Sequence, residues 1–315
     1  MSAVAAKRTP SGILARPESA LADSGLAQGR AVARAVALNL TKAMLLVVVL
    51  TAAAGGIGWL IGGLTTALLF AFCSLLAATG VYRYGDRALL GMLGARPFAV
   101  AEDPRLRSAA DTMAAKLGVR PPQLYLIPDG FPRLFAVGRG PSSSALAVST
   151  GALHSLRREE LEAAIAHELA HVRRRDVLVQ TFVVLFAATL LEASRLGGWL
   201  SRFLLYILAP IGAAFVHLLL SPKRELHSDA LAASATGSAH DLADALMRLD
   251  RASELVEFAG SPATEPLYSI DPFESEGIAR MFKTHPPLEV RIRRLRELGS
   301  GSNGRGDASV AELAR

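Results

Sequence analysis

The feature that most constrains the fold is a stretch of 40 residues without a charge, from Ala43 to Tyr82. Gly62 and Gly63 divide it into two halves of about 20 residues, and a helix of that length crosses a bilayer core of about 30 Å. The alternative is a helix pair in a soluble core, which so long an uncharged run disfavours. The stretch therefore predicts a transmembrane hairpin over residues 43–83.

Basic residues flank this hairpin and are missing from its turn. Those before it are Lys7, Arg8, Arg16, Arg30, Arg34 and Lys42, and those after it are Arg83, Arg87 and Arg96. Because Lys and Arg collect on the cytoplasmic side of membrane proteins, we expect both ends of the hairpin in the cytoplasm. The pattern predicts a multi-pass protein of the cell (inner) membrane.

Charge and cysteine usage narrow the possible partners. The excess of 34 basic over 28 acidic residues would suit nucleic acid or anionic lipid. Beside the apolar spans it favours the lipid bilayer, so we expect no nucleic acid partner. The only cysteine is Cys73, which excludes an intrachain disulfide and a thiolate zinc site. Residues 1–42 lack a sustained apolar face before about Ala31 and are predicted to form a mobile tail.

Two more apolar segments, Val177–Ser194 and Phe203–Pro222, are separated by a turn at Gly197 and Gly198. Their lengths are close to what a membrane span needs. The alternative is two core helices of a large soluble domain. We predict a second transmembrane hairpin over residues 177–220, which makes four transmembrane helices in all.

Metal chemistry is indicated by His167, Glu168 and His171, an H-E-x-x-H pattern within a run of helix-forming residues. Four residues are slightly more than one helical turn, so the two imidazoles lie on one face. Such a pair binds zinc, and the adjacent glutamate takes a proton from water on the metal. The alternative is a surface helix that carries two unrelated histidines.

A third metal ligand is predicted from the second hairpin. Val177 follows His171 by six residues, and we expect the helix of His171 to continue into this span. Two antiparallel spans then return Glu225, five residues after Leu220, to the depth of the histidine pair. His₂Glu is a standard catalytic zinc set, although Glu225 could instead be a solvated carboxylate. Asp229 lies on the same helical face, where it could accept the Nδ1–H of a ligand histidine.

The rest of the chain, residues 84–176 and 221–298, is predicted to form one catalytic domain in two parts. A helix is expected over Asp103–Leu117, and short strands over Gln123–Ile127, Leu134–Val137 and Ala145–Ser149. A small sheet beside a zinc helix can hold an extended peptide as one more strand, or it can serve only for packing. Residues 299–315 are predicted to be a disordered tail.

Three segments resemble HtpX-type integral-membrane zinc metalloendopeptidases, gluzincins related to CAAX prenyl proteases and mitochondrial OMA-type proteases. They are EAAIAHELAHVRRRD (162–176), SPKRELHSDA (221–230) and THPPLEVRIRRL (284–295). The resemblance implies His167 and His171 as ligands, Glu168 as the base and, through an R-E-x-x-A-D pattern, Glu225 as the third ligand. Ser228 stands where that pattern usually has Ala. The T-H-P-P block includes His285, and Arg291 follows it.

The family's N-A-F-A-x-G segment beside the cleft falls on residues 133–138, where Arg133 and Leu134 depart from it. The resemblance implies that Phe135 and Ala136 belong to the strand beside the cleft that binds the substrate. His285 lies before two prolines that stiffen the chain, so it could donate a hydrogen bond to the oxyanion. Its alternative role is to cap or pack beneath the catalytic domain.

The sequence therefore predicts a mainly α protein with a small β-sheet, four transmembrane helices and a cytosolic zincin-like domain built around the H-E-x-x-H helix. The predicted activity is zinc-dependent endopeptidase, with one Zn²⁺ per chain and polypeptide substrates. The resemblance implies quality control of membrane or misfolded proteins at the cytoplasmic face. One alternative is a membrane scaffold or adaptor with a structural zinc, which would have no use for Glu168 as a base. Another is a CAAX-type processing protease, which would need more spans.

Overall fold

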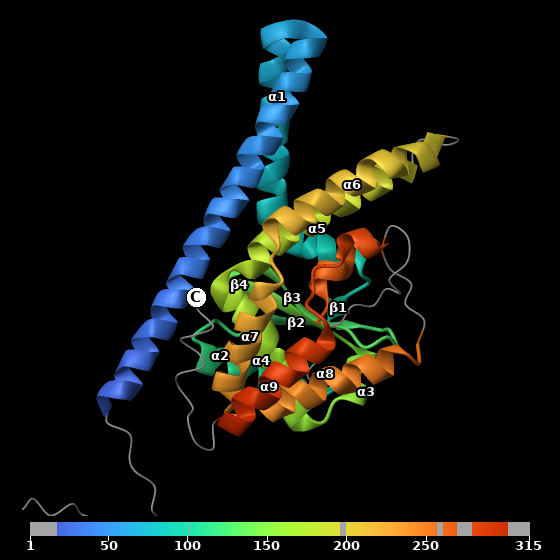
Figure 1. The fold of residues 1–315 in the computed structure, drawn as a ribbon. Helices are drawn as coiled ribbons and strands as arrows, with labels where there is room; N and C mark the ends of the chain where they lie inside the picture. Colours follow the sequence, from blue (N-terminus) through green and yellow to red (C-terminus); the bar gives the residue numbers. More distant parts are fainter. Residues whose placement is uncertain (1–17, 100, 196–199, 257–260, 270–278, 302–315) are drawn as a thin grey trace, which may run out of the picture.

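The computed structural model describes residues 18–99, 101–195, 200–256, 261–269 and 279–301. Within them the chain is mainly helical with one small mixed sheet, as the sequence predicts. A long helical hairpin projects from a rounded body, and a second pair of helices leaves the same side of that body (Figure 1).

The hairpin is α1 (Glu18–Met92), whose backbone is non-helical at Gly62 and Gly63, where the chain reverses (Figure 1). Gly63 has φ of 72°, a left-handed conformation that glycine adopts without strain. Near the turn the two arms touch, since a Cβ on Gly58 would lie 2.5 Å from the carbonyl oxygen of Thr66. The break lies at the predicted position.

Large apolar side chains on both arms of α1 are exposed, among them Leu60, Leu64 and Phe72. An exposed apolar surface of this extent suits contact with lipid. The predicted boundary of the N-terminal tail at residue 42 is wrong, because α1 already begins at Glu18. Residues 18–42 are rich in helix formers, and contacts of Asn39 and Lys42 with later helices hold this part of α1 in place. Residues 1–17 lie outside the described part of the chain.

The second pair comprises α5 (Asp176–Arg195) and α6 (Ser201–Leu219), which pack against each other with the rings of Phe186 and Phe215 4.8 Å apart. Among the described residues, α1 and α5 are long and apolar enough to cross a membrane. The pair α6 and α7 (Lys223–Thr236), bent by 47°, would make one more. Because α7 turns back onto the helix of the two histidines, we assign it to the body.

The helix of His167 and His171 is α4 (Arg158–Arg174). Contrary to the prediction, it ends before the apolar segment and does not continue into it. Arg175 adopts a left-handed conformation (φ 60°), and its N–H bonds to the carbonyls of His171 and Val172. α5 then starts anew at Asp176. This break is a correction to the prediction, and it lets the Asp176 side chain reach back to His171.

The sheet contains β1 (Arg96–Pro97), β2 (Gln123–Ile127), β3 (Leu134–Gly140) and β4 (Ser143–Ser149) in the order β1-β2-β4-β3. β2 and β4 run parallel, β3 pairs antiparallel with β4, and β3 forms an edge. All three predicted strands are present. α2 (Pro104–Leu117) is also as predicted, with Asp103 as N-cap and a left-handed Gly118 closing it.

The remaining elements complete the body. They are α3 (Thr150–Ser155), α8 (Ala239–Ser253), the 3₁₀ turns η2 (Pro262–Leu267) and η3 (Ala279–Phe282), and α9 (Leu288–Gly301). α9 extends beyond residue 298, so the predicted tail begins too early, and residues 302–315 lie outside the described chain.

Three apolar clusters connect these parts. The largest surrounds α4 and joins it to α2, α8 and one face of the sheet. The other face of the sheet receives Leu89 and Leu90, from the end of the second arm of α1, beside Phe135. Ala43 and Leu46, from the first arm, pack against α5. Both arms of the hairpin are thus built into the core that supports α4.

Candidate metal centre

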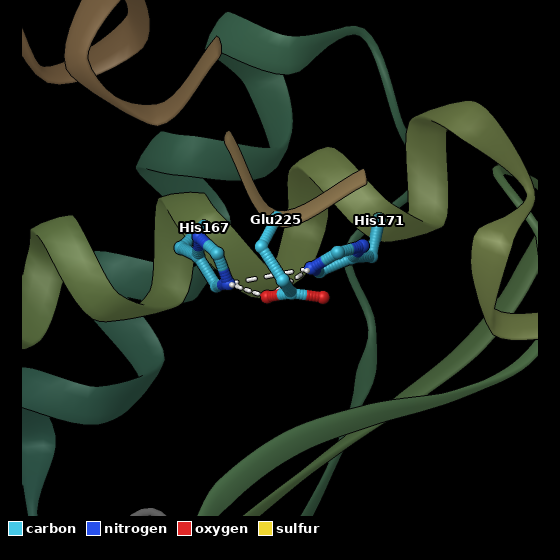
Figure 2. A group of neighbouring side chains, drawn as sticks. All are labelled: His167, His171 and Glu225. Carbon is cyan, nitrogen blue, oxygen red and sulfur yellow. Dashed lines mark hydrogen bonds and ion pairs between the residues drawn. The ribbon is translucent and has the colours of Figure 1, made fainter. Parts of the chain in front are cut away.

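Three side chains from two helices meet at one buried point (Figure 2). α4 supplies His167 and His171, and the first turn of α7 supplies Glu225, whose carboxylate lies between the two imidazoles. Glu225 Oε2 lies 3.3 Å from Nε2 of His167 and 3.5 Å from Nε2 of His171. The two Nε2 atoms are 3.3 Å apart. The structure therefore brings the three predicted ligands together.

The donor atoms fit a tetrahedral metal ion. Zinc bonds of about 2.0–2.1 Å to nitrogen and oxygen imply ligand atoms about 3.3–3.4 Å apart, close to the three separations found here. Neutral imidazole nitrogens and a carboxylate oxygen all present lone pairs, so their convergence in a buried site needs a cation or protons between them. Three protein ligands leave the fourth tetrahedral position open, as catalytic zinc sites require.

His167 has the outer partner that the sequence predicted. Its Nδ1 lies 2.9 Å from Oδ1 of Asp229, and because a carboxylate only accepts, this contact directs the Nε2 lone pair toward Glu225. Burial opposes the charge on Asp229, but Arg291 and His167 outweigh it and lower the carboxyl pKa to about 2. Burial likewise opposes a charged His167, yet Asp229 and Glu225 raise its pKa to about 9.

His171 has an outer partner that sequence reasoning missed. Its Nδ1 lies 3.1 Å from Oδ2 of Asp176, which also accepts from Nε of Arg174 at 3.1 Å. The other oxygen of Asp176 accepts from the side chain of Asn39 in the first arm of α1. Ser228, the departure from the family pattern, places its Oγ 3.2 Å from the same Nδ1. A signal was available, since Asp176 ends the first of the three resembling segments.

Glu225 is fixed by a cation as well as by the histidines. Nε of Arg224 lies 3.0 Å from its Oε1, and Nη2 of Arg224 donates to the carbonyl of Pro266 at 3.0 Å. Burial would raise the pKa of Glu225, but His171, His285 and Arg224 hold it well below its usual range. Glu225 is therefore a buried, ionised carboxylate and not the solvated one of the alternative interpretation.

The predicted base, Glu168, is held at both carboxylate oxygens. Oε2 accepts from the backbone N–H of Ala136 at 3.0 Å, and Oε1 accepts from the hydroxyl of Ser269 at 2.8 Å. The carbonyl of Ser269 accepts from Nη1 of Arg291 at 2.7 Å. Phe135 is fully buried and meets Tyr268 edge-on, with ring centroids 6.0 Å apart. The edge strand therefore reaches the base through the backbone of Ala136, whereas the Phe135 side chain belongs to the core.

His285 lies beside the triad, with Nε2 3.9 Å from Oε2 of Glu225. Its Nδ1 is 2.9 Å from Oε1 of Glu265, and that oxygen also accepts from the backbone N–H of Thr284. The hydroxyl of Thr284 donates to the other carboxylate oxygen, Oε2. Burial opposes ionisation of Glu265, but His285 and Thr284 outweigh it and lower its pKa. No sequence signal marks Glu265, because it lies 20 residues from His285 in a segment without a recognisable pattern.

The departures at Arg133 and Leu134 leave the edge strand intact. Arg133 N–H donates to Oγ of Ser149, and its carbonyl accepts from Ser149 N–H, both at 2.8 Å. Its buried guanidinium pairs with Asp129 and lies over the ring of Phe131. β3 then begins at Leu134 and pairs with β4.

Comparisons with known proteins agree with this geometry. The family described as "Peptidase family M48" matches residues 100–299. A protease HtpX homolog from Pelotomaculum thermopropionicum is 35% identical over 276 residues, which cover 82% of this chain and 98% of that protein. A protease HtpX homolog from Acidiphilium cryptum is 39% identical over 280 residues, covering 82% and 96%. One from Pyrococcus abyssi is 34% identical over 266 residues, covering 79% and 92%.

Proposed function

Because the chain belongs to peptidase family M48 and is a membrane zinc metalloprotease, we propose that His167, His171 and Glu225 hold one zinc ion per chain. The observation that carries this proposal is the set of 3.3–3.5 Å separations among their donor atoms. Zinc held by these residues would polarise the scissile carbonyl as a Lewis acid and would lower the pKa of the attacking water toward about 7.

Glu168 is the general base in this proposal. Its carboxylate removes a proton from the attacking water and later delivers that proton to the leaving amine nitrogen. Ala136 N–H and Ser269 Oγ fix its two oxygens, so the carboxylate keeps its position through both transfers. Asp229 and Asp176 hold the two histidines in the tautomer that leaves Nε2 free to bind metal.

His285 is proposed to stabilise the oxyanion. Glu265 holds Nδ1 of the ring, and Nε2 faces Glu225 of the triad, the side from which it would donate to the oxyanion. A substrate peptide is proposed to lie along the open edge of β3, where Ala136 meets the base. Extended peptides commonly bind by adding a strand to such an edge, with main-chain hydrogen bonds supplying affinity.

The substrates are proposed to be membrane proteins or misfolded proteins, cleaved at the cytoplasmic face of the cell membrane in quality control. Support comes from the joint between the body and the helices, since α5 begins five residues after His171 and carries Asp176 at its start. The basic residues that flank the hairpin support the orientation. Four spans would result if both arms of α1, α5 and α6 each cross the bilayer.

The two alternative functions receive less support. A scaffold with a structural zinc would have no use for a carboxylate held at both oxygens beside an open metal position. A CAAX-type enzyme would need further spans to enclose a lipidated substrate, and the described chain has α1, α5 and the bent pair α6–α7 as its span candidates.

The test compares Glu168→Gln with wild type for zinc content and for cleavage of an unfolded membrane substrate. The variant should retain zinc and lose about 10²–10⁴-fold in turnover, because the amide cannot accept the proton. Glu159→Gln, an exposed change on the same helix, is the matched control and should leave both unchanged. Wild-type turnover in Glu168→Gln would show that the base is assigned wrongly.

A further inference from the structure

A groove of about 430 Å³ lies between the first arm of α1, the start of α5 and the junction of α6 with α7. We call it the basic groove, because its lining includes five cationic side chains. These are Arg34, Lys42, Arg174, Lys223 and Arg224. Apolar side chains of α1, α5 and α6 form much of the remaining wall. Asp176 and Arg224 line the groove and also contact His171 and Glu225, whereas the three triad side chains themselves are not part of the lining.

The charge in the basic groove is only partly neutralised. Arg174 pairs with Asp176, and Arg224 pairs with Glu225. The other three cations, Arg34, Lys42 and Lys223, form no ion pair with any carboxylate in the described residues. Uncompensated positive charge in a concave site attracts an anion, and low-dielectric walls strengthen the attraction.

The position of the groove along α1 and α6 indicates that it lies at the membrane surface. Lys42 is the last residue before the uncharged stretch, and its Nζ donates to the carbonyl of Leu219 at 2.8 Å. Leu219 is the last residue of α6. A span therefore begins and another ends at the groove, at the level where lipid phosphates lie. Leu38, one turn before Lys42, and Leu219 and Leu220, at the end of α6, supply apolar lining beside this level.

We propose that the basic groove binds the headgroup phosphate of an anionic phospholipid. Basic pockets between transmembrane helices on the cytoplasmic side recognise such headgroups, whose phosphate oxygens accept from Lys and Arg. A lipid is favoured over free phosphate because Leu38, Leu219 and Leu220 line the groove beside Lys42, where they would contact the glycerol and the first methylenes. The bound headgroup would lie one side chain from two proposed zinc ligands, through Asp176 to His171 and through Arg224 to Glu225.

The experiment uses the full-length Glu168→Gln protein in detergent, so that the result does not depend on proteolysis. Native mass spectrometry measures retention of phosphatidylglycerol and of phosphatidylcholine with the same acyl chains. The test variant is Arg34→Gln with Lys223→Gln. The matched control is Arg83→Gln with Arg87→Gln, which removes two exposed cations from the same membrane boundary outside the groove.

The parent protein and the control should retain phosphatidylglycerol in preference to phosphatidylcholine. The test variant should bind phosphatidylglycerol about 25-fold more weakly, because each of the two cations near an anionic headgroup contributes roughly fivefold. The variant Arg34→Lys with Lys223→Arg keeps both positive charges and should preserve binding. That result would show that the site tolerates substitution at these two positions.

Three results would overturn the proposal. Equal weakening in the control would indicate general attraction to the basic membrane boundary. Equal retention of phosphatidylcholine would remove any role for the anionic headgroup. Displacement of phosphatidylglycerol by an equal concentration of inorganic phosphate would identify an ion site without a lipid component. Each outcome is distinguishable from a failure of the protease assignment, because the measurement requires no turnover.

Discussion

The guanidinium of Arg291 holds both carboxylate oxygens of Asp229, through Nε at 2.9 Å and Nη2 at 2.6 Å. Asp229 in turn contacts Nδ1 of His167, so α9 is connected to the metal centre through two buried side chains. The remaining nitrogen, Nη1, donates to the carbonyl of Ser269, whose hydroxyl contacts Glu168. One arginine therefore orients both a proposed zinc ligand and the proposed base.

Replacing Arg291 by Gln should destabilise the protein by about 3–5 kcal/mol, because it leaves the buried charge of Asp229 without its partner. Unfolding of the metal-free protein in denaturant, followed by far-UV circular dichroism, measures the loss. Arg293→Gln, an exposed change on the same helix, should alter stability by about 0.5 kcal/mol or less. If both variants unfold at the same denaturant concentration, the Asp229–Arg291 pair has no structural role.

Replacing His285 by Ala should reduce kcat by about 10²-fold without changing the melting temperature, because it removes an oxyanion donor. Glu265→Gln is the companion variant, since it keeps a hydrogen-bond acceptor at Nδ1 of His285 while removing the negative charge. Glu265→Gln should also lower kcat, but by a smaller factor than His285→Ala. A His285→Ala protein that mainly unfolds, or one with full kcat, would leave His285 only the packing role.

Zinc binding should release at least one proton, because His167 in the metal-free protein has a pKa of about 9 and must be neutral to bind metal. The apparent affinity for zinc should therefore rise about tenfold per pH unit between about pH 6 and 8. Competition with a chelator of known pH dependence measures this slope. Asp229→Asn, which removes the carboxylate that favours the protonated ring, should flatten it. A flat profile in wild type would contradict the ligand role of His167.

The same pKa sets the pH dependence of stability in the metal-free protein. The folded pKa of His167 lies above its ordinary value of 6.5, so its protonation stabilises the fold fully below about that pH. The contribution is lost as the pH rises through about 9. Denaturant unfolding at several pH values should show this decline, and added zinc should abolish it.

Cysteine labelling in intact cells should place the body in the cytoplasm. In a Cys73→Ala background, Thr65→Cys lies just after the turn of the hairpin, and Lys116→Cys lies at the end of α2 in the body. Both side chains are exposed. A membrane-impermeant reagent should label residue 65 from outside, and residue 116 only after the cells are lysed. Labelling of residue 116 in intact cells would reverse the topology and remove the basis for cytoplasmic substrates.

Local sequence patterns predicted the parts of the molecule that depend on local geometry. His167, Glu168 and His171 share a helix whose period fixes their spacing, and β2 and α2 have clear end signals at Pro128 and Gly118. Glu225 was predictable because two antiparallel segments of similar length must return the chain to its starting depth.

The parts that were missed depend on tertiary contacts. Asp176 meets His171 only because Arg175 adopts a left-handed conformation, and no glycine marks that position in the sequence. Glu265 reaches His285 from a 3₁₀ turn that carries no motif. The helical start of α1 was read as a tail because its stabilising contacts come from helices more than 100 residues later.

The hydrogen bond from Asn39 to Asp176 has a consequence for the order in which the protein matures. Asn39 belongs to α1, which is synthesised well before α5, whereas Asp176 follows the histidine helix by one residue of turn. The outer partner of His171 is complete only after the first arm of α1 has docked against α5. Docking of these two helices is thus a step in completing the surroundings of His171, and the proposed zinc site and the helical hairpin are expected to mature together.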